Sequence, residues 1–503
     1  MNQLPENNPK SFPFWLSIPL SMAAILLIGL LITKAFPSLP QTSSTKLAFD
    51  SVPSRPFDEK IALAAVNTTP VDAKSNPTKA EWIQAKQSFS IPQSVQHTDL
   101  FSIKDKTVLI SSDNRTCPNN CEGVKRDDTI FNLFFTEIDQ AKSTLGASYQ
   151  LTEYTSSITI IKTIWDSYNN EFVTFFNNSI ILGDGSVGII RIAADGRNHS
   201  KAIKLQLTSG GLQAPFIDSI GNIIIVSTIE PATDFTGTFG SDQESISFFD
   251  KEGNSRSNQY IVSCKTLFHV EKCSTRNTYG VTREIIEINK QLYLAEGFLI
   301  EQADNKRIEN QIFLPFSETG TNPEKVVVLD LSVARARKTD PDYPIVDFSL
   351  HRVDEHLFAT WNENPGRPSY EYNFYIAEIA TATMQISKSV KIPKLNISTV
   401  SSDDQYLYVG AFSLQGCLEP TLLAITTDLL LKEKLGNFPC DNMYSEMDLA
   451  IGSDTLGVII KPGDLEKHFF PSTNYYSAKK PNPTLPAVSV SDWVYLPTSP
   501  ETR

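Results

Sequence analysis

The sequence is poor in the residues that enzymes use most often for acid–base and nucleophilic chemistry. It holds only 6 histidines and 6 cysteines in 503 residues. It contains no G-x-S-x-G nucleophile elbow, no Walker sequence, no H-E-x-x-H motif and no EF-hand loop. The sequence therefore names no catalytic, cofactor-binding or metal-binding residue. Whether the protein is an enzyme stays open, and a role other than catalysis is favoured.

An excess of positive charge is also missing. The chain has 44 Lys and Arg residues against 57 Asp and Glu residues, a formal net charge of −13. Nucleic-acid binding needs a clustered positive surface, so we expect no nucleic-acid partner.

Long stretches with helical periodicity are absent from about residue 97 onwards. Hydrophobic residues make up 41% of the chain, which is enough for a large core. They fall in short runs rich in Ile, Val, Leu, Phe and Tyr, separated by turn residues, which is the pattern of β-strands. We therefore expect an all-β domain over residues 97–503.

One long apolar run stands near the start of the chain. Pro13–Thr33 carries no charged side chain and is bracketed by Lys10 and Lys34. As a helix, these residues would span about 32 Å, close to the roughly 30 Å thickness of the hydrocarbon core of a bilayer. The sequence predicts a transmembrane anchor at 13–33 after a short cytoplasmic tail at 1–12. A cleaved signal peptide is the alternative, although Thr33-Lys34-Ala35 is a poor cleavage site.

A tether is predicted between the anchor and the β domain. Residues 34–96 are rich in Pro, Ser and Thr, and residues 36–96 contain no glycine. Thr78 and Glu81 have the spacing of a capping box, so one short helix is predicted at 79–88.

The cysteines form three local pairs: Cys117 and Cys121, Cys264 and Cys273, and Cys417 and Cys440. Disulfides persist in oxidising compartments, and we favour three local bridges over free thiols or a zinc site. With the anchor, they predict a single-pass membrane protein with a cytoplasmic N-terminus. The bulk domain would then be periplasmic or extracellular, as in a bacterial envelope protein or a eukaryotic type II membrane protein.

A turn followed by a short apolar strand recurs along the β domain. Seven such strands are predicted, at residues 107–111, 179–182, 222–227, 291–295, 356–360, 405–409 and 455–460. A second strand follows in six cases, at residues 129–138, 187–193, 245–250, 325–331, 370–379 and 421–426. Long insertions are expected at about 140–160, 228–244, 264–282 and 300–322.

These repeats predict a β-propeller of about seven blades, with tandem β-sandwiches as the alternative. The segment Asp218–Val226 resembles the D-x-x-G-N-hydrophobic strand entry of the β-propeller superfamily. The Trp-Asp and paired-glycine marks of particular propeller families are absent, so the resemblance implies a shape and no activity. The alternating run Val488–Leu496 is expected to pair with the first blade, near 97–150, and to close the ring.

Three segments have features of ligand- or metal-binding sites. Gly183–Gly188 matches G-x-G-x-x-G, but a strand follows it, so we interpret it as a hairpin turn. His351–His356 has the composition of a metal site, but we interpret it as a solvated turn between strands. Loop 111–128 is acidic around Cys117 and Cys121, so it is either a calcium-binding loop or a solvated charged loop.

The function that the sequence favours is an anchored, exported propeller that binds a protein, peptide or glycan partner in the cell envelope. The alternative is a propeller enzyme, a hydrolase or lyase acting on a sugar or ester, with carboxylates at the central channel. The membrane is the second expected partner, through the N-terminal helix.

Overall fold

The structure of the chain is a computed structural model. It describes residues 51–53, 55–56, 86–91, 95–103, 106–115, 130–139, 144–154, 159–177, 186–207, 213–228, 244–261, 273–275, 284–301, 307–329, 331, 345–363, 373–413, 419–435, 438, 444–462 and 473–497. The expected tail and anchor lie outside these residues. No helix among the described residues has the length and apolar character needed to cross a membrane.

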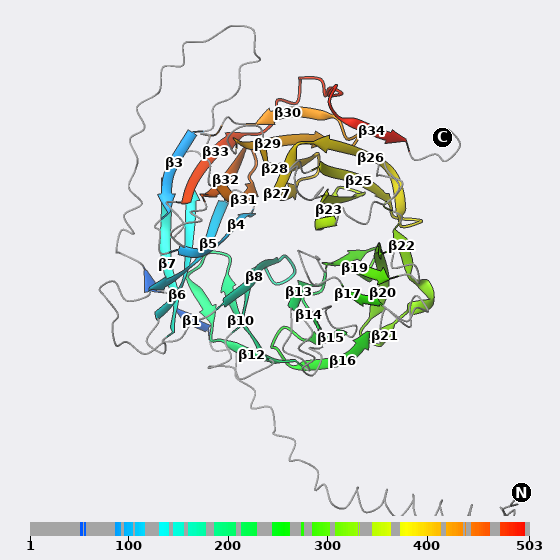
Figure 1. Ribbon diagram of the computed structural model, residues 1–503. Helices are drawn as coiled ribbons and strands as arrows, with labels where there is room; N and C mark the ends of the chain where they lie inside the picture. Colours follow the sequence, from blue (N-terminus) through cyan, green and yellow to red (C-terminus); the bar gives the residue numbers. More distant parts are fainter. Residues whose placement is uncertain are drawn as a thin grey trace, which may run out of the picture. The chain divides into compact units, whose positions relative to one another are not determined.

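Seven antiparallel sheets stand around a central axis, which makes the fold a seven-bladed β-propeller (Figure 1). Each blade is a meander that starts near the central axis and runs outward, so consecutive strands pair with each other. From the axis outward, blade 1 holds β4 (Val95–Ile103), β5 (Lys106–Arg115), β6 (Ile130–Asp139), β7 (Thr144–Tyr154) and β2 (Arg55–Pro56). Blade 2 holds β8 (Thr159–Asp166), β9 (Glu171–Asn177) and β10 (Ser186–Ala193), followed by β12 (Ile203–Gln206), β11 (Asn198–Ser200) and β1 (Ser51–Pro53).

The next two blades complete the lower half of the ring in Figure 1. Blade 3 holds β13 (Gln213–Ile217), β14 (Ile223–Thr228), β15 (Glu244–Phe249) and β16 (Ser255–Ile261). In blade 4, β17 (Cys273–Thr275) and β18 (Glu284–Ile288) share the inner place beside β19 (Gln291–Glu301). Outside them lie β20 (Arg307–Ser317), β21 (Gly320–Thr321) and β22 (Val327–Leu329), with the 3-10 turn η3 (Pro323–Lys325) between the last two.

The last three blades follow the same plan. Blade 5 holds β23 (Ile345–Val353), β24 (His356–Glu363), β25 (Asn373–Ala380), β26 (Gln385–Pro393) and β34 (Val494–Pro497). Blade 6 holds β27 (Leu395–Ser402), β28 (Tyr406–Ser413), β29 (Glu419–Thr426) and β30 (Leu431–Leu435). Blade 7 holds β31 (Tyr444–Ile451), β32 (Thr455–Pro462), β33 (Thr473–Lys479) and, outermost, β3 (Lys86–Ile91).

Six of the seven predicted first strands are confirmed as the second strand of a blade, namely β5, β14, β19, β24, β28 and β32. The exception is blade 2, whose second strand is β9, whereas the strand predicted at 179–182 lies outside the described residues. β9 holds five consecutive buried residues, and the apolar run at 179–182 that was predicted in its place follows it closely in the chain.

Two of the expected insertions are strands instead. Residues 144–154 form β7, and residues 307–317 form β20. Both strands begin with residues that the hydrophobic pattern does not single out, Thr144 and Arg307. The segment predicted at 325–331 overlaps β22, which lies outside β20 in blade 4.

The ring is closed by the N-terminal side of the domain, and the prediction for the C-terminus was wrong. β3 pairs with β33 as the fourth strand of blade 7, where Lys86 opposes Ser477 and Ile91 opposes Thr473. The strand near the C-terminus is shorter than predicted, and it pairs with β26 in blade 5. β3 also occupies residues 86–88 of the predicted helix; the rest of that helix lies outside the described residues.

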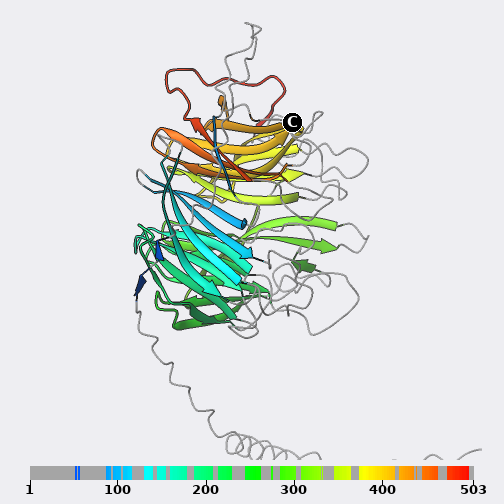
Figure 2. The ribbon, with the colours of Figure 1, turned by 90° about the vertical axis from the view of Figure 1, so that its left-hand side faces the viewer.

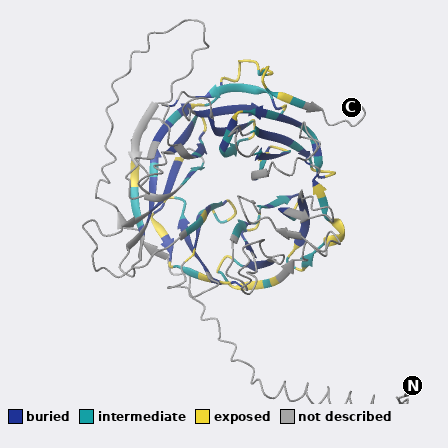
Figure 3. Ribbon diagram, in the orientation of Figure 1, coloured by how far each residue is buried: buried dark blue, intermediate teal, exposed yellow. Residues whose placement is uncertain are grey.

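The core consists of seven hydrophobic clusters among the described residues, one at each interface between neighbouring blades. The cluster between blades 7 and 1 joins Ala450, Ile459 and Tyr475 to Leu100 and Leu109. Figure 3 shows the buried strands around the ring, and Figure 2 shows the blades from the side. Because every blade buries both faces against a neighbour, an open ring would expose two apolar faces at once.

Short turns join the first strand of a blade to the second, and the third to the fourth. In a meander these turns all emerge at the same face, which we call the short-turn face. In the turn at Asp218, its carboxylate accepts hydrogen bonds from the backbone N–H and the side-chain Nδ2 of Asn222, both at 2.8 Å. The turn at Asp250 repeats this geometry with Asn254. Gly221 and Gly253 both have φ of +82°, a left-handed conformation that glycine adopts without strain.

Candidate functional site

The inner strands of neighbouring blades are joined by a repeated hydrogen bond. The backbone N–H of Thr163 in blade 2 donates to Oδ2 of Asp99 in blade 1, at 3.0 Å. Leu350 N–H donates to Oε2 of Glu284 across the interface of blades 4 and 5, at 2.6 Å. Met447 N–H donates to Oγ of Ser398 across the interface of blades 6 and 7, at 2.7 Å.

A β-bulge precedes each of these three donors. The registers of β8, β23 and β31 shift at Lys162, Ser349 and Glu446, one residue before the donor. A bulge leaves a backbone group without a ladder partner, and a polar side chain of the preceding blade accepts from it. These side chains therefore join neighbouring blades.

Two titratable groups of the inner strands are shifted by burial. Burial raises the pKa of Glu284, and the hydrogen bonds from Leu350 and Ser349 and the charge of Lys162 oppose the shift in part. Burial lowers the pKa of His351 to about 3, so its imidazole is neutral. His351 Nε2 lies 3.0 Å from the hydroxyl of Thr360.

The segment His351–His356 is a strand end and a tight turn, as predicted. Its two histidines have separate partners, because His356 Nδ1 contacts Oε1 of Glu378 in β25. Burial raises the pKa of Glu378, but hydrogen bonds from His356, Ser387 and Lys388 outweigh it and lower the pKa overall. Within the described ranges, no three His, Cys, Asp or Glu side chains are grouped to hold a metal ion.

The other two segments are described only in part. Ser186–Ala193 forms β10 and pairs with β9, so the expected strand after the glycines is confirmed, while residues 183–185 lie outside the description. In loop 111–128, Asp113 and Asn114 belong to β5, and residues 116–128 are not described. Of the six cysteines, only the backbone of Cys273 is described, so the disulfides and calcium stay predictions.

A buried arginine joins blades 2 and 3. Arg191 is 1% exposed, and its Nη1 lies 3.4 Å from Oδ2 of Asp166 and also contacts Glu171. Its Nε donates to the carbonyl of Lys251, 2.9 Å away in blade 3. Burial raises the pKa of Glu171, and Arg191 opposes this shift. The sequence pattern did not single out Arg191, because it lies within an apolar strand.

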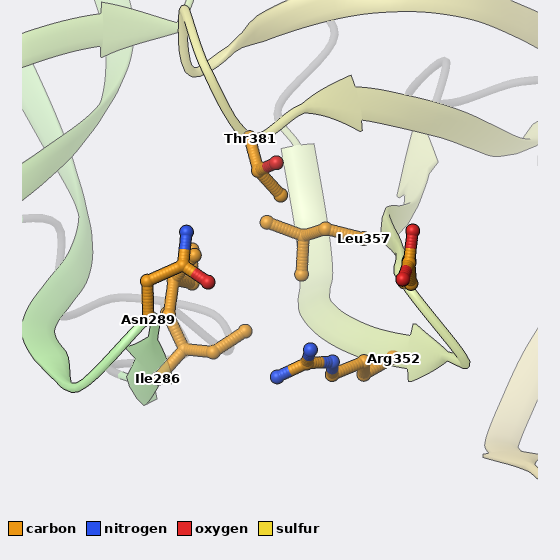
Figure 4. Close-up of a pocket in the computed structure, with 7 residues that line it drawn as sticks. Ile286, Asn289, Arg352, Leu357 and Thr381 are labelled. Atoms are coloured by element: carbon orange, nitrogen blue, oxygen red, sulfur yellow. The ribbon is translucent and has the colours of Figure 1, made fainter.

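A groove opens between blades 4 and 5, with a volume of about 330 Å³. Its floor is apolar and consists of Ile286 and Ile288 from β18 and Leu357 from β24. Figure 4 shows Arg352 extending from blade 5 toward Ile286 of blade 4, with Asn289 and Thr381 around the same space.

The polar lining of this groove is exposed and consists of Asn289, Arg352, Glu355 and Thr381. Nε of Arg352 donates to the carbonyl of Asp354 at 2.9 Å, which fixes the guanidinium on its own turn. Among the described residues, its Nη1 and Nη2 have no hydrogen-bond or ion-pair partner. Glu355 lies on the same groove, but no ion pair joins it to Arg352 within that part of the chain. The groove therefore presents one fixed cation, one carboxylate and two neutral polar groups above an apolar floor.

The turns around the groove contain an unusual share of left-handed backbone. Four of the seven described non-glycine residues with positive φ lie in them, namely Asn289, Lys290, Asp354 and Met384. Such conformations cost on the order of 1–3 kcal/mol each and concentrate at functional sites. Sequence reasoning missed this groove. The only signal was a set of short polar turns, which every blade shares.

Comparisons with known proteins give matches to solved structures alone. Neither a protein-family model nor a curated protein matches it. The polysaccharide lyase Uly1 is similar over 81% of this chain and 94% of its own, with 10% identity and a TM-score of 0.45. The β-propeller domain of the Trilobed protease from Pyrococcus furiosus is similar over 78% and 100%, with 8% identity and a TM-score of 0.40.

A sialidase from Trypanosoma rangeli is similar over 78% of this chain and 55% of its own, with 9% identity and a TM-score of 0.35. At these identities and TM-scores we base no inference about activity on the likeness. The order of strands in the seven sheets is what shows that the chain is a β-propeller.

Proposed function

We propose that the protein is a binding module that recognises a protein or peptide partner through the short-turn face of its propeller. The N-terminal segment would display it on the outer side of a membrane, as the apolar run 13–33 predicts. The observation that carries the proposal is the groove between blades 4 and 5, whose polar rim has side chains without partners among the described residues. Ligand pockets combine an apolar lining with a few polar groups that fix orientation, as this groove does.

The same face carries exposed apolar side chains. Tyr168 and Ile220 are 63% and 60% exposed, the largest fractions among the large hydrophobic residues that the structure describes. They lie in the first turns of blades 2 and 3. A Cβ on Gly221 would lie 3.1 Å from Cδ1 of Tyr168, so the two turns are in contact. Tyrosine, arginine and apolar side chains are typical of the central part of protein interfaces.

A hydrogen bond connects this apolar pair to the groove. The hydroxyl of Ser219, next to Ile220, donates to Oε1 of Glu287 at 2.7 Å, and its backbone N–H donates to Oε2 at 2.8 Å. Glu287 stands in β18 between Ile286 and Ile288, which form the floor of the groove. The turn of blade 3 is thereby fixed against the strand that lines the groove, so one partner can contact both.

The described residues of the inner strands favour binding over catalysis. Asp99 and Glu284 accept backbone hydrogen bonds that join blades, and His351 is neutral and bonded to Thr360. General acid–base catalysis needs groups that are free to exchange protons with a substrate.

One observation favours the alternative, an enzyme with carboxylate chemistry at the channel. The raised pKa of Glu284 is the property expected of a general acid. A sugar- or ester-cleaving activity abolished by Glu284→Gln, in a variant that melts like the wild type, would support the enzyme.

The binding proposal is tested by filling the groove. Thr381→Trp places an indole at the rim, whereas Thr383→Trp places one in the same turn, at a position that does not line the groove. A library of 12-residue peptides is selected against the wild-type protein, and the affinities of the selected peptides are measured for both variants. We expect Thr381→Trp to weaken binding at least about tenfold and Thr383→Trp to leave it unchanged. Equal affinities for both variants, or no selected peptide, would overturn the proposal.

A further inference from the structure

We propose that the groove between blades 4 and 5 binds the C-terminal residue of the partner, with the carboxylate on Arg352 and an aliphatic side chain on the apolar floor. This inference rests on the binding function proposed above and names the chemistry of the ligand.

The carboxylate is assigned from the guanidinium. The hydrogen bond from Nε to the carbonyl of Asp354 orients the planar group, and no residue that the structure describes bonds to Nη1 or Nη2. A guanidinium fork matches a carboxylate in geometry and charge. A fixed arginine also loses less side-chain entropy on binding than one that is free to rotate.

The aliphatic side chain is assigned from the floor. Ile288 and Leu357 are 8% and 2% exposed, and partly buried Ile286 lies beside them. No aromatic ring lines the groove among the described residues, so the stacking surface that sugar rings use is missing. A branched aliphatic side chain such as that of leucine matches this surface in size and polarity. A volume of about 330 Å³ lies at the lower end of the range for ligand sites, about 300–1,000 Å³.

The remaining polar groups favour a peptide over a free aliphatic acid. Glu355 is an acceptor and would repel a ligand that presented only a carboxylate. A C-terminal residue also presents a backbone N–H, and the residue before it presents a carbonyl. Glu355 is suited to accept a hydrogen bond from this backbone N–H. Asn289 or Thr381 is suited to donate one to the carbonyl. The last two residues of a partner thus supply partners for Arg352, for Glu355 and for one of the two neutral polar groups.

The probes are two fluorescein-labelled peptides, Gly-Gly-Ser-Leu with a free carboxylate and the same peptide with a C-terminal amide. Binding is measured by fluorescence polarisation with wild-type protein and with Arg352→Gln. The control is Arg197→Gln, because Arg197 is a highly exposed arginine in another turn of the same face. We expect amidation and Arg352→Gln each to weaken binding about tenfold or more. Their combination should weaken it no further, and Arg197→Gln should change nothing.

Three outcomes would overturn the inference. Equal binding of the amide and the free acid would show that the protein does not recognise the carboxylate. Equal binding by wild type and Arg352→Gln would show that Arg352 does not bind the peptide. Free isovalerate that displaces the peptide at the peptide's own dissociation constant would identify a site for small acids instead.

Failure of this inference can be told apart from failure of the proposed function. If library peptides still lose affinity with Thr381→Trp while the free carboxylate has no effect, the binding function stands and the assignment to a C-terminus falls. If Thr381→Trp affects no ligand, both fall.

Discussion

At the scale of single residues, the described titratable groups of the inner strands serve mainly to join blades. Glu284 and His351 both lie on inner strands, and both have pKa values shifted by burial toward the neutral form. A buried neutral group with a hydrogen-bond partner costs less than a buried charge. These two residues therefore make the stability of the protein depend on pH in opposite directions.

Glu284→Gln tests the first shift. A raised pKa means that the folded state binds a proton more readily than the unfolded state, whose glutamate has the ordinary value of 4.5. The contribution of this group to stability is therefore complete below the unfolded value and is lost as the pH rises through the folded value. We expect the unfolding free energy of Glu284→Gln, relative to wild type, to increase as the pH rises from about 4.5 to 8.

Urea unfolding of both proteins measures this difference. Glu284→Ala, which leaves the Leu350 N–H without an acceptor, should lose about 1–3 kcal/mol. Glu324→Ala, at an exposed position in η3, should change the unfolding free energy by less than about 0.5 kcal/mol. A constant difference between Glu284→Gln and wild type across the pH range would contradict the raised pKa.

His351→Gln tests the second shift, which has the opposite sign. The folded pKa is lowered to about 3 from its ordinary 6.5, so below pH 6.5 the unfolded chain binds a proton that the folded protein does not. Stability from this group is present above 6.5 and is lost as the pH falls, by at most about 1.4 kcal/mol per pH unit. We expect His351→Gln to lose less stability than wild type between about pH 6.5 and 4. Parallel stability curves for the two proteins would contradict it.

At the scale of elements, the hairpin turns were the structures that the sequence predicted most directly. The segments at Asp218 and Asp250 close their hairpins entirely within five residues, using the carboxylate of the first residue and the amide of the last. Such local hydrogen bonds do not depend on the rest of the fold. β9 was missed because a second apolar run, at 179–182, follows it closely and was predicted to be the strand of that blade.

The Asp side chains of these turns can be removed one at a time. Asp218→Ala and Asp250→Ala each delete a carboxylate that accepts from the backbone and the side chain of an asparagine, and each should cost about 1–2 kcal/mol in unfolding free energy. Asp454→Ala is the control, because Asp454 lies in the turn between β31 and β32 and its side chain has no hydrogen bond within the described residues. It should cost less than about 0.5 kcal/mol. Equal losses for all three variants would show that these carboxylates do not stabilise the turns.

At the scale of the whole molecule, the ring is held by a strand from before the first blade. β3 covers the outer edge of β33 and joins the start of the domain to its last blade. β34 adds a fifth strand to blade 5, and its absence would leave that blade with four. We therefore expect β3 to contribute more than β34 to the stability of the ring.

Truncations separate these roles. A chain that begins at residue 92 lacks β3 and should melt several degrees lower and less cooperatively than the wild type, because the edge of β33 is exposed. A chain that begins at residue 82 also lacks the short outer strands β1 and β2 but keeps β3, and it should melt closer to the wild type than the chain that begins at 92. A chain that ends at residue 486 lacks β34 and should lose less than the chain that begins at 92. The opposite order of melting temperatures would place ring closure at the C-terminus.

The sequence by itself determined the β class, the repeat and the count of about seven blades, because turns and strand alternation are encoded within a few consecutive residues. Only the tertiary structure decided which strand closes the ring, since any exposed strand edge can accept another strand. It also decided the site. The groove combines Ile286, Arg352 and Thr381, which are distant in the chain and meet only when blades 4 and 5 pack together. A side chain's unused hydrogen-bonding groups become visible only when its neighbours are in place.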